Sequence, residues 1–76
     1  MKQLIEEIVK TLVDHPEQVV VQEVAGQQSI VYEIKVDPAD IGKVIGKQGK
    51  TANAIRFLIR AAAAKNGKNA VINIIS

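Results

Sequence analysis

Two glycines separated by two polar residues, in the segment Gly46-Lys47-Gln48-Gly49, are the residues of this sequence best suited to binding chemistry. Glycine at both positions permits a tight turn and lets a ligand's backbone come close to the protein main chain. Where a helix begins after such a loop, its first amides and its dipole favour phosphate oxygens. Lys43, Lys47 and Lys50 add positive charge around the loop. The pattern therefore predicts a site for a phosphate-bearing ligand, with a helix-to-helix corner that binds nothing as the competing interpretation.

Apolar side chains precede the loop and predict what else the ligand would contact. Ile41, Val44 and Ile45 form this group. Once a sugar-phosphate backbone is held by the glycine loop, unstacked bases could rest on an apolar surface beside it. We therefore expect these three side chains to belong to the binding surface.

A polar stripe follows the loop at helical spacing and comprises Asn53, Arg56 and Arg60. Of the two arginines, Arg56 is closer to the glycines in sequence, so we expect it to contact the ligand. Arg60 is predicted to be too distant. An ordinary solvated helix face is the alternative interpretation of the stripe.

The glycines do not fit either of the two common nucleotide-binding loops. The segment Gly49-Lys50-Thr51 matches the end of a phosphate-binding P-loop, but that loop needs a glycine five positions before Gly49, where Val44 stands. The dinucleotide fingerprint needs a glycine two positions before Gly46, which is again Val44. Both also require a strand leading into the loop, whereas a helix is predicted here.

The charges of the sequence are segregated along the chain. Residues 1–40 hold all eight acidic residues and three lysines, a balance of 3 − 8 = −5, and residues 41–76 hold seven lysines and arginines with no acid, a balance of +7. Unopposed positive charge attracts polyanions, and phosphate contacts by Lys and Arg provide most non-specific affinity for nucleic acids. The second half is thus predicted to bind nucleic acid, or else to be a solvated basic face.

Several classes of function are disfavoured by composition. The chain has no cysteine and one histidine, so we predict no disulfide, no zinc site and no cofactor. His15 precedes Pro16 and is interpreted as a helix-end residue, because no nucleophile or second base accompanies it. The carboxylates lie away from the glycine loop, so an enzyme is not expected. The first residues lack the apolar run of a signal peptide or membrane span, and a cytoplasmic location is predicted.

Two helices must position the glycine loop, and residues 38–66 are predicted to form this helix-loop-helix unit. Asp37 precedes Pro38 as a candidate cap, and Asp40 is expected to reach back to it from the third helical position. The first helix is short and ends by Ile45. The second runs from residue 50 to residue 66, where Gly67 is suited to a left-handed stop.

The other predicted elements are an amphipathic helix over residues 1–14, a β-hairpin over residues 18–36 and a last strand over residues 70–75. A helical crossover lets the last strand pair parallel to the second hairpin strand. The expected order is α-β-β-α-α-β in one domain of residues 1–76. This predicts an α+β fold in which three helices cover one face of a three-stranded mixed sheet.

The long second helix is apolar over more of its circumference than packing on one sheet requires. The face expected to meet the sheet comprises Ala52, Ile55, Ile59 and Ala62. A further apolar flank comprises Ala54, Phe57, Leu58 and Ala61. We hypothesise that this flank forms a dimer interface centred on Phe57 and Leu58. Coverage of the flank by the N-terminal helix of the same chain is the alternative.

The segment from Val44 to Lys50 resembles the I-G-x-x-G signature of the KH family, and the element order resembles the type II arrangement of that fold. The length, the cap at residues 37–38 and the stretch from Gly49 to Arg56 further resemble the small bacterial KhpA family. This resemblance covers essentially the whole chain.

The resemblance implies an RNA-binding protein of the cytoplasm with low sequence specificity, acting as an RNA chaperone or post-transcriptional regulator. It places backbone binding on Gly46, Lys47, Gln48 and Gly49. It also implies association with a second copy or with a larger KH-containing partner of the KhpB or Jag type. The loop over residues 65–69 corresponds to the family's variable loop. Two alternatives stay open: a protein-assembly module with incidental RNA binding, and a binder of single-stranded DNA.

Overall fold

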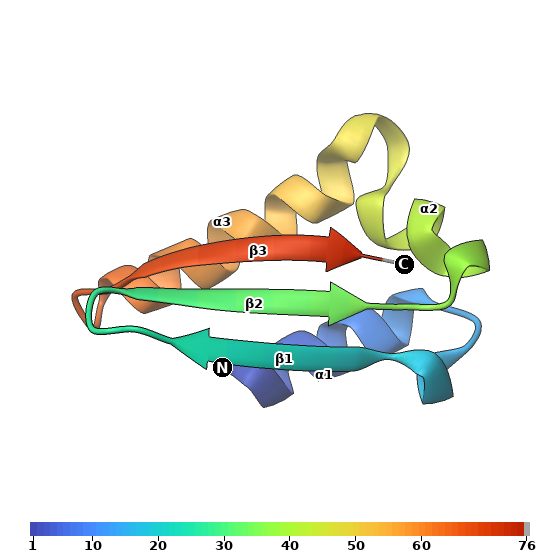
Figure 1. Cartoon of the computed structure of the whole chain (residues 1–76). Helices are drawn as coiled ribbons and strands as arrows, with labels where there is room; N and C mark the ends of the chain where they lie inside the picture. The colour runs from blue at the N-terminus through green and yellow to red at the C-terminus, as the bar shows by residue number, and fades with distance from the viewer. Residues whose placement is uncertain (76) are drawn as a thin grey trace.

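The order of elements in the computed structural model, which describes residues 1–75, follows the predicted α-β-β-α-α-β series (Figure 1). The predicted domain runs on to Ser76, which lies outside the described residues. The helices and strands are α1 (Lys2–Leu12), β1 (Val20–Ala25), β2 (Ser29–Lys35), α2 (Ile41–Ile45), α3 (Lys50–Ala64) and β3 (Asn69–Ile75). Three short 3-10 turns separate them, at Pro16–Gln18, Pro38–Asp40 and Lys47–Gly49.

The sheet has the predicted mixed topology, with β2 between its two neighbours. The β1 strand runs antiparallel to β2, and Val20 pairs with Lys35. The β3 strand runs parallel to β2, so that Ser29 pairs with Asn69. The parallel pair is possible because the chain returns to the start of the sheet through α2 and α3.

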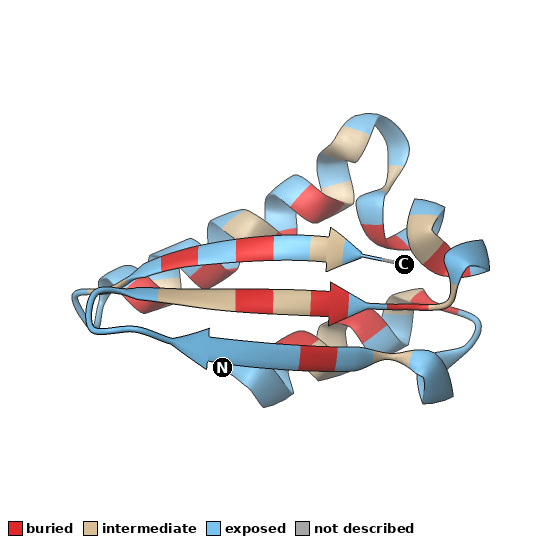
Figure 2. Cartoon of the chain, in the orientation of Figure 1, coloured by how far each residue is buried: buried red, intermediate tan, exposed pale blue. Residues whose placement is uncertain are grey.

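The core lies between one face of the sheet and the helices, because the strand residues alternate between the two faces. On β2, Tyr32 and Ile34 are buried, while the exposed Lys35 faces the other way. Figure 2 shows buried positions alternating with exposed ones along β3, and Figure 1 shows α1 and α3 lying behind the same face of the sheet. The predicted one-sided cover by helices is confirmed.

The α3 helix packs on the sheet through Ala52, Ile55, Ile59 and Ala63. The prediction placed Ala62 in this row, but Ala62 is only partly buried. The spacing explains the difference: Ala63 follows Ile59 by four residues and stays on the same face, whereas Ala62 has turned away from it.

The predicted stop after α3 is confirmed at Gly67, which has a φ of +71°. Its N–H donates to the Ala64 carbonyl at 3.0 Å, and the next N–H, of Lys68, donates to the Ala63 carbonyl at 3.1 Å. This pair of bonds is the Schellman arrangement that satisfies the last carbonyls of a helix. The α-helix itself ends at Ala64, two residues before the predicted end.

Candidate nucleic-acid interface

The glycine loop joins α2 to α3 through three residues with positive φ angles. Gly46 has φ +78° and ψ 172°, a region that residues with a side chain essentially never adopt. Gly49 lies in the left-handed region with φ +75°, and Gln48 is left-handed as well with φ +57°. The two glycines thus allow the chain to reverse within one turn and to present Lys47 and Gln48 at its outer end, where both are exposed.

Gly46 is also required because of a close neighbour that the sequence pattern did not reveal. A Cβ at this position would overlap the side chain of Thr51 and would lie 2.9 Å from the Thr51 amide nitrogen. At Gly49 the nearest atom to an added Cβ is Asn53 Nδ2, at 3.9 Å. Gly46 is therefore required both by its backbone angles and by the closeness of Thr51, whereas Gly49 is required only by its backbone angles.

The loop leaves two main-chain donors without an internal acceptor. The N–H of Gly46 donates to the Gly42 carbonyl at 2.9 Å, and the N–H of Gly49 donates to the Gly46 carbonyl at 3.1 Å. Within residues 1–75, the amides of Lys47 and Gln48 make no such bond. Successive amides in alternating right- and left-handed turns form a concavity that binds anions, so these two N–H groups suit the ligand chemistry predicted for the loop.

The apolar group predicted beside the loop is only partly available. Val44 is 0% exposed and belongs to the core, so its assignment to the binding surface was wrong. Ile41 is half-buried against the same core, and Ile45 is the exposed member of the three. In a short helix that packs against α3 and α1, the middle residue turns inward and the last one remains at the surface.

The predicted cap at Asp37 is confirmed, because its carboxylate accepts the Ala39 N–H at 2.9 Å. The predicted role of Asp40 was wrong. Its carboxylate is 1% exposed and turns toward the connection after α1, where it accepts the backbone N–H groups of Asp14 at 3.3 Å and His15 at 3.0 Å. A bond between segments 25 residues apart has replaced the local one.

Two side chains complete this cluster around Asp40. His15 Nδ1 lies 3.1 Å from one carboxylate oxygen, and Lys43 Nζ lies 3.7 Å from the other and also bonds to Asp14. The hydrogen bond that His15 makes to the Asp40 carboxylate raises the pKa of His15. Burial acts to raise the pKa of Asp40, but the hydrogen bonds from His15 and from the two backbone amides outweigh it and hold that pKa low. Lys43 is therefore paired within the protein.

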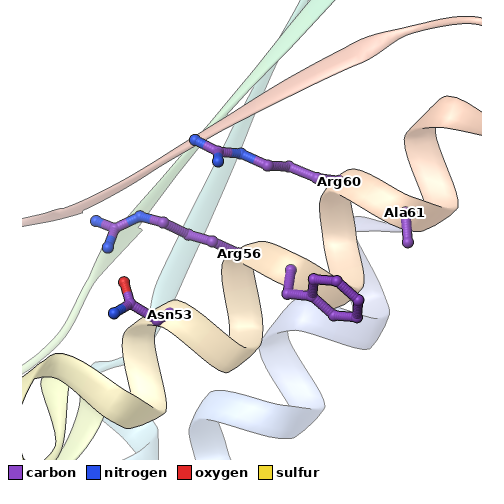
Figure 3. A pocket seen from close by; sticks show the side chains of 5 residues that line it. Asn53, Arg56, Arg60 and Ala61 are labelled. Carbon is purple, nitrogen blue, oxygen red and sulfur yellow. The ribbon is translucent and has the colours of Figure 1, made fainter.

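The polar stripe of α3 borders a hollow of about 510 Å³ (Figure 3). Asn53, Arg56 and Arg60 extend from the same side of the helix in Figure 3. The guanidinium Nε of Arg56 donates to the Ile72 carbonyl of β3 at 3.4 Å. Ala61 and Phe57 complete the lining.

A second hollow, of about 430 Å³, lies between the end of α3 and the start of β3. It is lined by Arg60 together with Ala64, Lys68, Asn69 and Ala70. Because Arg60 lines both hollows, it connects the glycine-loop end of α3 to the loop over residues 65–69. The sequence predicted that Arg60 is too distant from the glycine loop to contact the ligand, and this stays a prediction; the structure adds that Arg60 lies between the two hollows.

The apolar flank of α3 is not covered by α1, so the alternative of coverage within the chain is wrong. Phe57 is 73% exposed and Leu58 is 56% exposed. Ala54 and Ala61 are exposed as well.

Other kinds of site find no support in the described residues. Residues 1–75 contain no group of three or more His, Cys, Asp or Glu side chains that could hold a metal ion. In the same range, no helix combines the length and apolar character needed to span a membrane.

Comparison with known proteins gives a consistent result. The model of the family described as KhpA/KhpB, KH domain, matches residues 2–74. A relative named RNA-binding protein KhpA, from Clostridium acetobutylicum, is 60% identical over 75 residues, which cover 99% of this chain and all of the relative. Proteins of the same name from Clostridium perfringens and Aquifex aeolicus are 57% and 44% identical, covering 99% of this chain and 100% and 95% of the relatives. No solved structure matched.

Proposed function

Since the chain belongs to the KhpA/KhpB family of KH domains, we propose that it binds single-stranded RNA and that the loop from Gly46 to Gly49 holds the RNA backbone. The name of its relatives, RNA-binding protein, supports the first part of the proposal. Within this proposal the protein acts in the cytoplasm as an RNA chaperone or post-transcriptional regulator.

One observation carries the assignment of the loop. The amides of Lys47 and Gln48 have no acceptor within the described residues and sit between two glycines with positive φ. Phosphate oxygens would supply the missing acceptors, and the exposed Lys47 side chain would neutralise the charge.

The surroundings of the loop fit a tolerant binder. Phosphate contacts fix the position of a strand without reading its sequence. Ile45 offers an exposed apolar contact for a base, and Arg56 and Arg60 continue the positive surface along α3. Lys50 adds charge at the start of this helix, whereas Lys43 would first have to leave Asp14 and Asp40.

The chain itself offers a matched control for testing the loop. Replacing Lys47 and Gln48 by Asp places carboxylates where phosphates are expected. The same dipeptide occurs as Lys2-Gln3 at the exposed start of α1, so replacing that pair by Asp makes an identical change of charge away from the loop.

In fluorescence anisotropy with single-stranded RNA, the loop variant should lose binding and the α1 variant should stay close to the parent. Equal affinities for both variants would contradict the loop assignment. Failure of the parent to bind any RNA would contradict the function itself. The same titration with DNA of matching sequence tests the alternative that single-stranded DNA is the ligand, because only RNA presents the 2′-hydroxyl.

We further propose that the apolar flank of α3 is a surface for a second KH domain. The flank predicted from the sequence comprises Ala54, Phe57, Leu58 and Ala61, and all four residues are exposed in the monomer. We now centre the proposed surface on Leu58. Its partner would be a second copy or a protein of the KhpB or Jag type. Assembly as the main role, with incidental RNA binding, is the second candidate function, and exposure of 56% of Leu58 favours it.

A further inference from the structure

Unlike Leu58, the other large side chain of the apolar flank, Phe57 lies beside the polar stripe of α3. It is 73% exposed and lines the 510 Å³ hollow with Asn53, Arg56, Arg60 and Ala61. Residues three and four apart are neighbours on a helix, so Phe57 adjoins Asn53 and Arg60. Leu58 comes next in sequence, which turns it about 100° around the helix, and it does not line the hollow.

The hollow combines the groups that recognise a nucleobase. The Phe57 ring supplies a flat apolar face, Asn53 an amide that can both donate and accept, and the arginines cations for the attached phosphates. Residues 41–76 contain no carboxylate side chain, so an anionic ligand meets no repulsion from the side chains of this half of the chain.

The same composition disfavours a second copy as the occupant centred on Phe57. In a two-fold contact each protomer presents the same patch to the other. Arg56 and Arg60 would then face the corresponding arginines, and like charges brought together across an interface oppose association. RNA brings the opposite charge.

The hollow is also continuous with the glycine loop. Asn53 Nδ2 lies 3.9 Å from the position of a Cβ on Gly49, and Phe57 follows Asn53 by four residues. At about 1.5 Å per residue, Phe57 lies about 12 Å along the helix from Gly49. A strand held at the loop therefore passes the ring as it continues along α3.

From these contacts we infer that Phe57 is a stacking platform for a base of the bound RNA, on the outer surface of α3. The inference rests on the proposed RNA binding and extends it from the loop to a second contact. It assigns Asn53 to the edge of the stacked base and Arg60 to the phosphate that follows.

The absence of tryptophan from the sequence makes a direct test possible. Phe57→Trp places the protein's single indole at the proposed platform, and Leu58→Trp places it at the adjacent exposed position. Stacking on a base should quench the indole emission of the Phe57→Trp protein when oligoadenylate is added, and should leave the emission of the Leu58→Trp protein nearly unchanged. Inorganic polyphosphate, which has charge but no bases, should quench neither.

Affinity supplies the second readout. Aromatic-to-base stacking contributes enough that Phe57→Leu should weaken binding of oligoadenylate by roughly tenfold to a hundredfold, whereas Phe57→Trp should retain it. Val24→Ala is the control, because Val24 is 61% exposed on β1 and away from α3, and this variant should bind as the parent does. Circular dichroism establishes that each variant is folded.

The possible outcomes separate this inference from the proposed function. Two results would overturn the platform: unchanged emission of the Phe57→Trp protein at saturating RNA, or equal RNA affinities of Phe57→Leu and the parent. Neither result would overturn the proposed RNA binding by the loop, as long as replacing Lys47 and Gln48 by Asp still abolished binding. If Phe57→Leu lost RNA affinity only because it changed from dimer to monomer, as measured by light scattering, the platform would be overturned in favour of a role of Phe57 in self-association. Quenching by oligoadenylate but not by polyphosphate, together with affinity retained in Phe57→Trp, would support it.

Discussion

At the scale of single residues, the two loop glycines are needed for different physical reasons. Gly49 needs its positive φ and has room for a methyl group, while Gly46 needs both an unusual backbone conformation and the space that Thr51 fills. We therefore predict that Gly49→Ala lowers the free energy of unfolding by about 1–2 kcal/mol. Gly46→Ala should lower it by more, about 3 kcal/mol or above, because overlap with Thr51 adds to the backbone strain. Urea unfolding measures both changes.

Gly67 provides the control for these two substitutions. It also has a positive φ, no atom lies within 4 Å of its added Cβ, and it is at the far end of α3. Gly67→Ala should lower the free energy of unfolding about as much as Gly49→Ala, since at both positions the strain comes from the positive φ alone. It should leave RNA affinity unchanged. A Gly46→Ala protein as stable as the Gly49→Ala protein would show that the Thr51 contact relaxes at no cost.

The burial of single side chains beside the loop could not be predicted from the sequence. The spacing of two glycines with exposed polar residues between them was enough to predict the loop. The same reasoning grouped Val44 with Ile41 and Ile45, because all three are apolar and adjacent to the loop. Which of them faces the core depends on how the short α2 helix packs against α3 and α1, and only the structure placed Val44 at 0% exposure.

At the scale of elements, the Asp40 cluster joins the connection after α1 to the start of α2, and through α2 to the glycine loop. The local pattern Asp37-Pro38 predicted the cap correctly. It could not predict that Asp40 would bond to residues 14 and 15, because the approach of these segments is set by the packing of α1 on the sheet. By contrast, the parallel pairing of β3 was predictable, since a helical crossover leaves few other arrangements.

This cluster makes stability depend on pH. Asp40 raises the pKa of His15, so the folded protein favours the protonated imidazole. The stabilisation is complete below the ordinary pKa of about 6.5 and is lost as the pH rises through the higher folded value. Between about pH 6 and about pH 8, the Tm of the parent should fall relative to that of His15→Gln, which has no imidazole to titrate.

The charged groups facing His15 and Asp40 are Asp14, Glu17, Asp37 and Lys43. Asp40→Asn keeps only one of the two acceptor oxygens and removes the charge. When His15→Gln is made in the Asp40→Asn protein, it should therefore change the pH profile of Tm much less than it does in the parent. Parallel pH profiles of Tm for the parent and His15→Gln would contradict the coupling. The N-terminal amine also titrates near this pH range, but it is present in both proteins. The difference between their pH profiles of Tm therefore reports the imidazole of His15 alone.

At the scale of the whole molecule, charge segregation follows the fold. The acid-free residues 41–76 include α2, the glycine loop, α3 and β3, whereas the acidic half forms α1 and the hairpin. Lys43 lies at the boundary and pairs with Asp14 and Asp40 across it. Among residues 41–75, Lys43 alone takes part in an ion pair, so under the proposed function the other basic side chains are available to the RNA backbone. The sequence predicted the basic half, the glycine loop and the apolar flank, whereas the two hollows along α3 required the structure.

The apolar flank gives the last prediction, which concerns assembly. Leu58→Lys places a charge at the exposed centre of the flank and should convert a dimer of the parent into a monomer, measured by light scattering at high concentration. Val24→Lys is the matched control, because Val24 is 61% exposed on β1 and the change adds the same charge elsewhere. RNA long enough to span two domains should bind the parent about a hundredfold or more tighter than Leu58→Lys, while RNA that fills one domain should not distinguish them. A monomeric parent, or a dimeric Leu58→Lys protein, would rule out this flank as the interface.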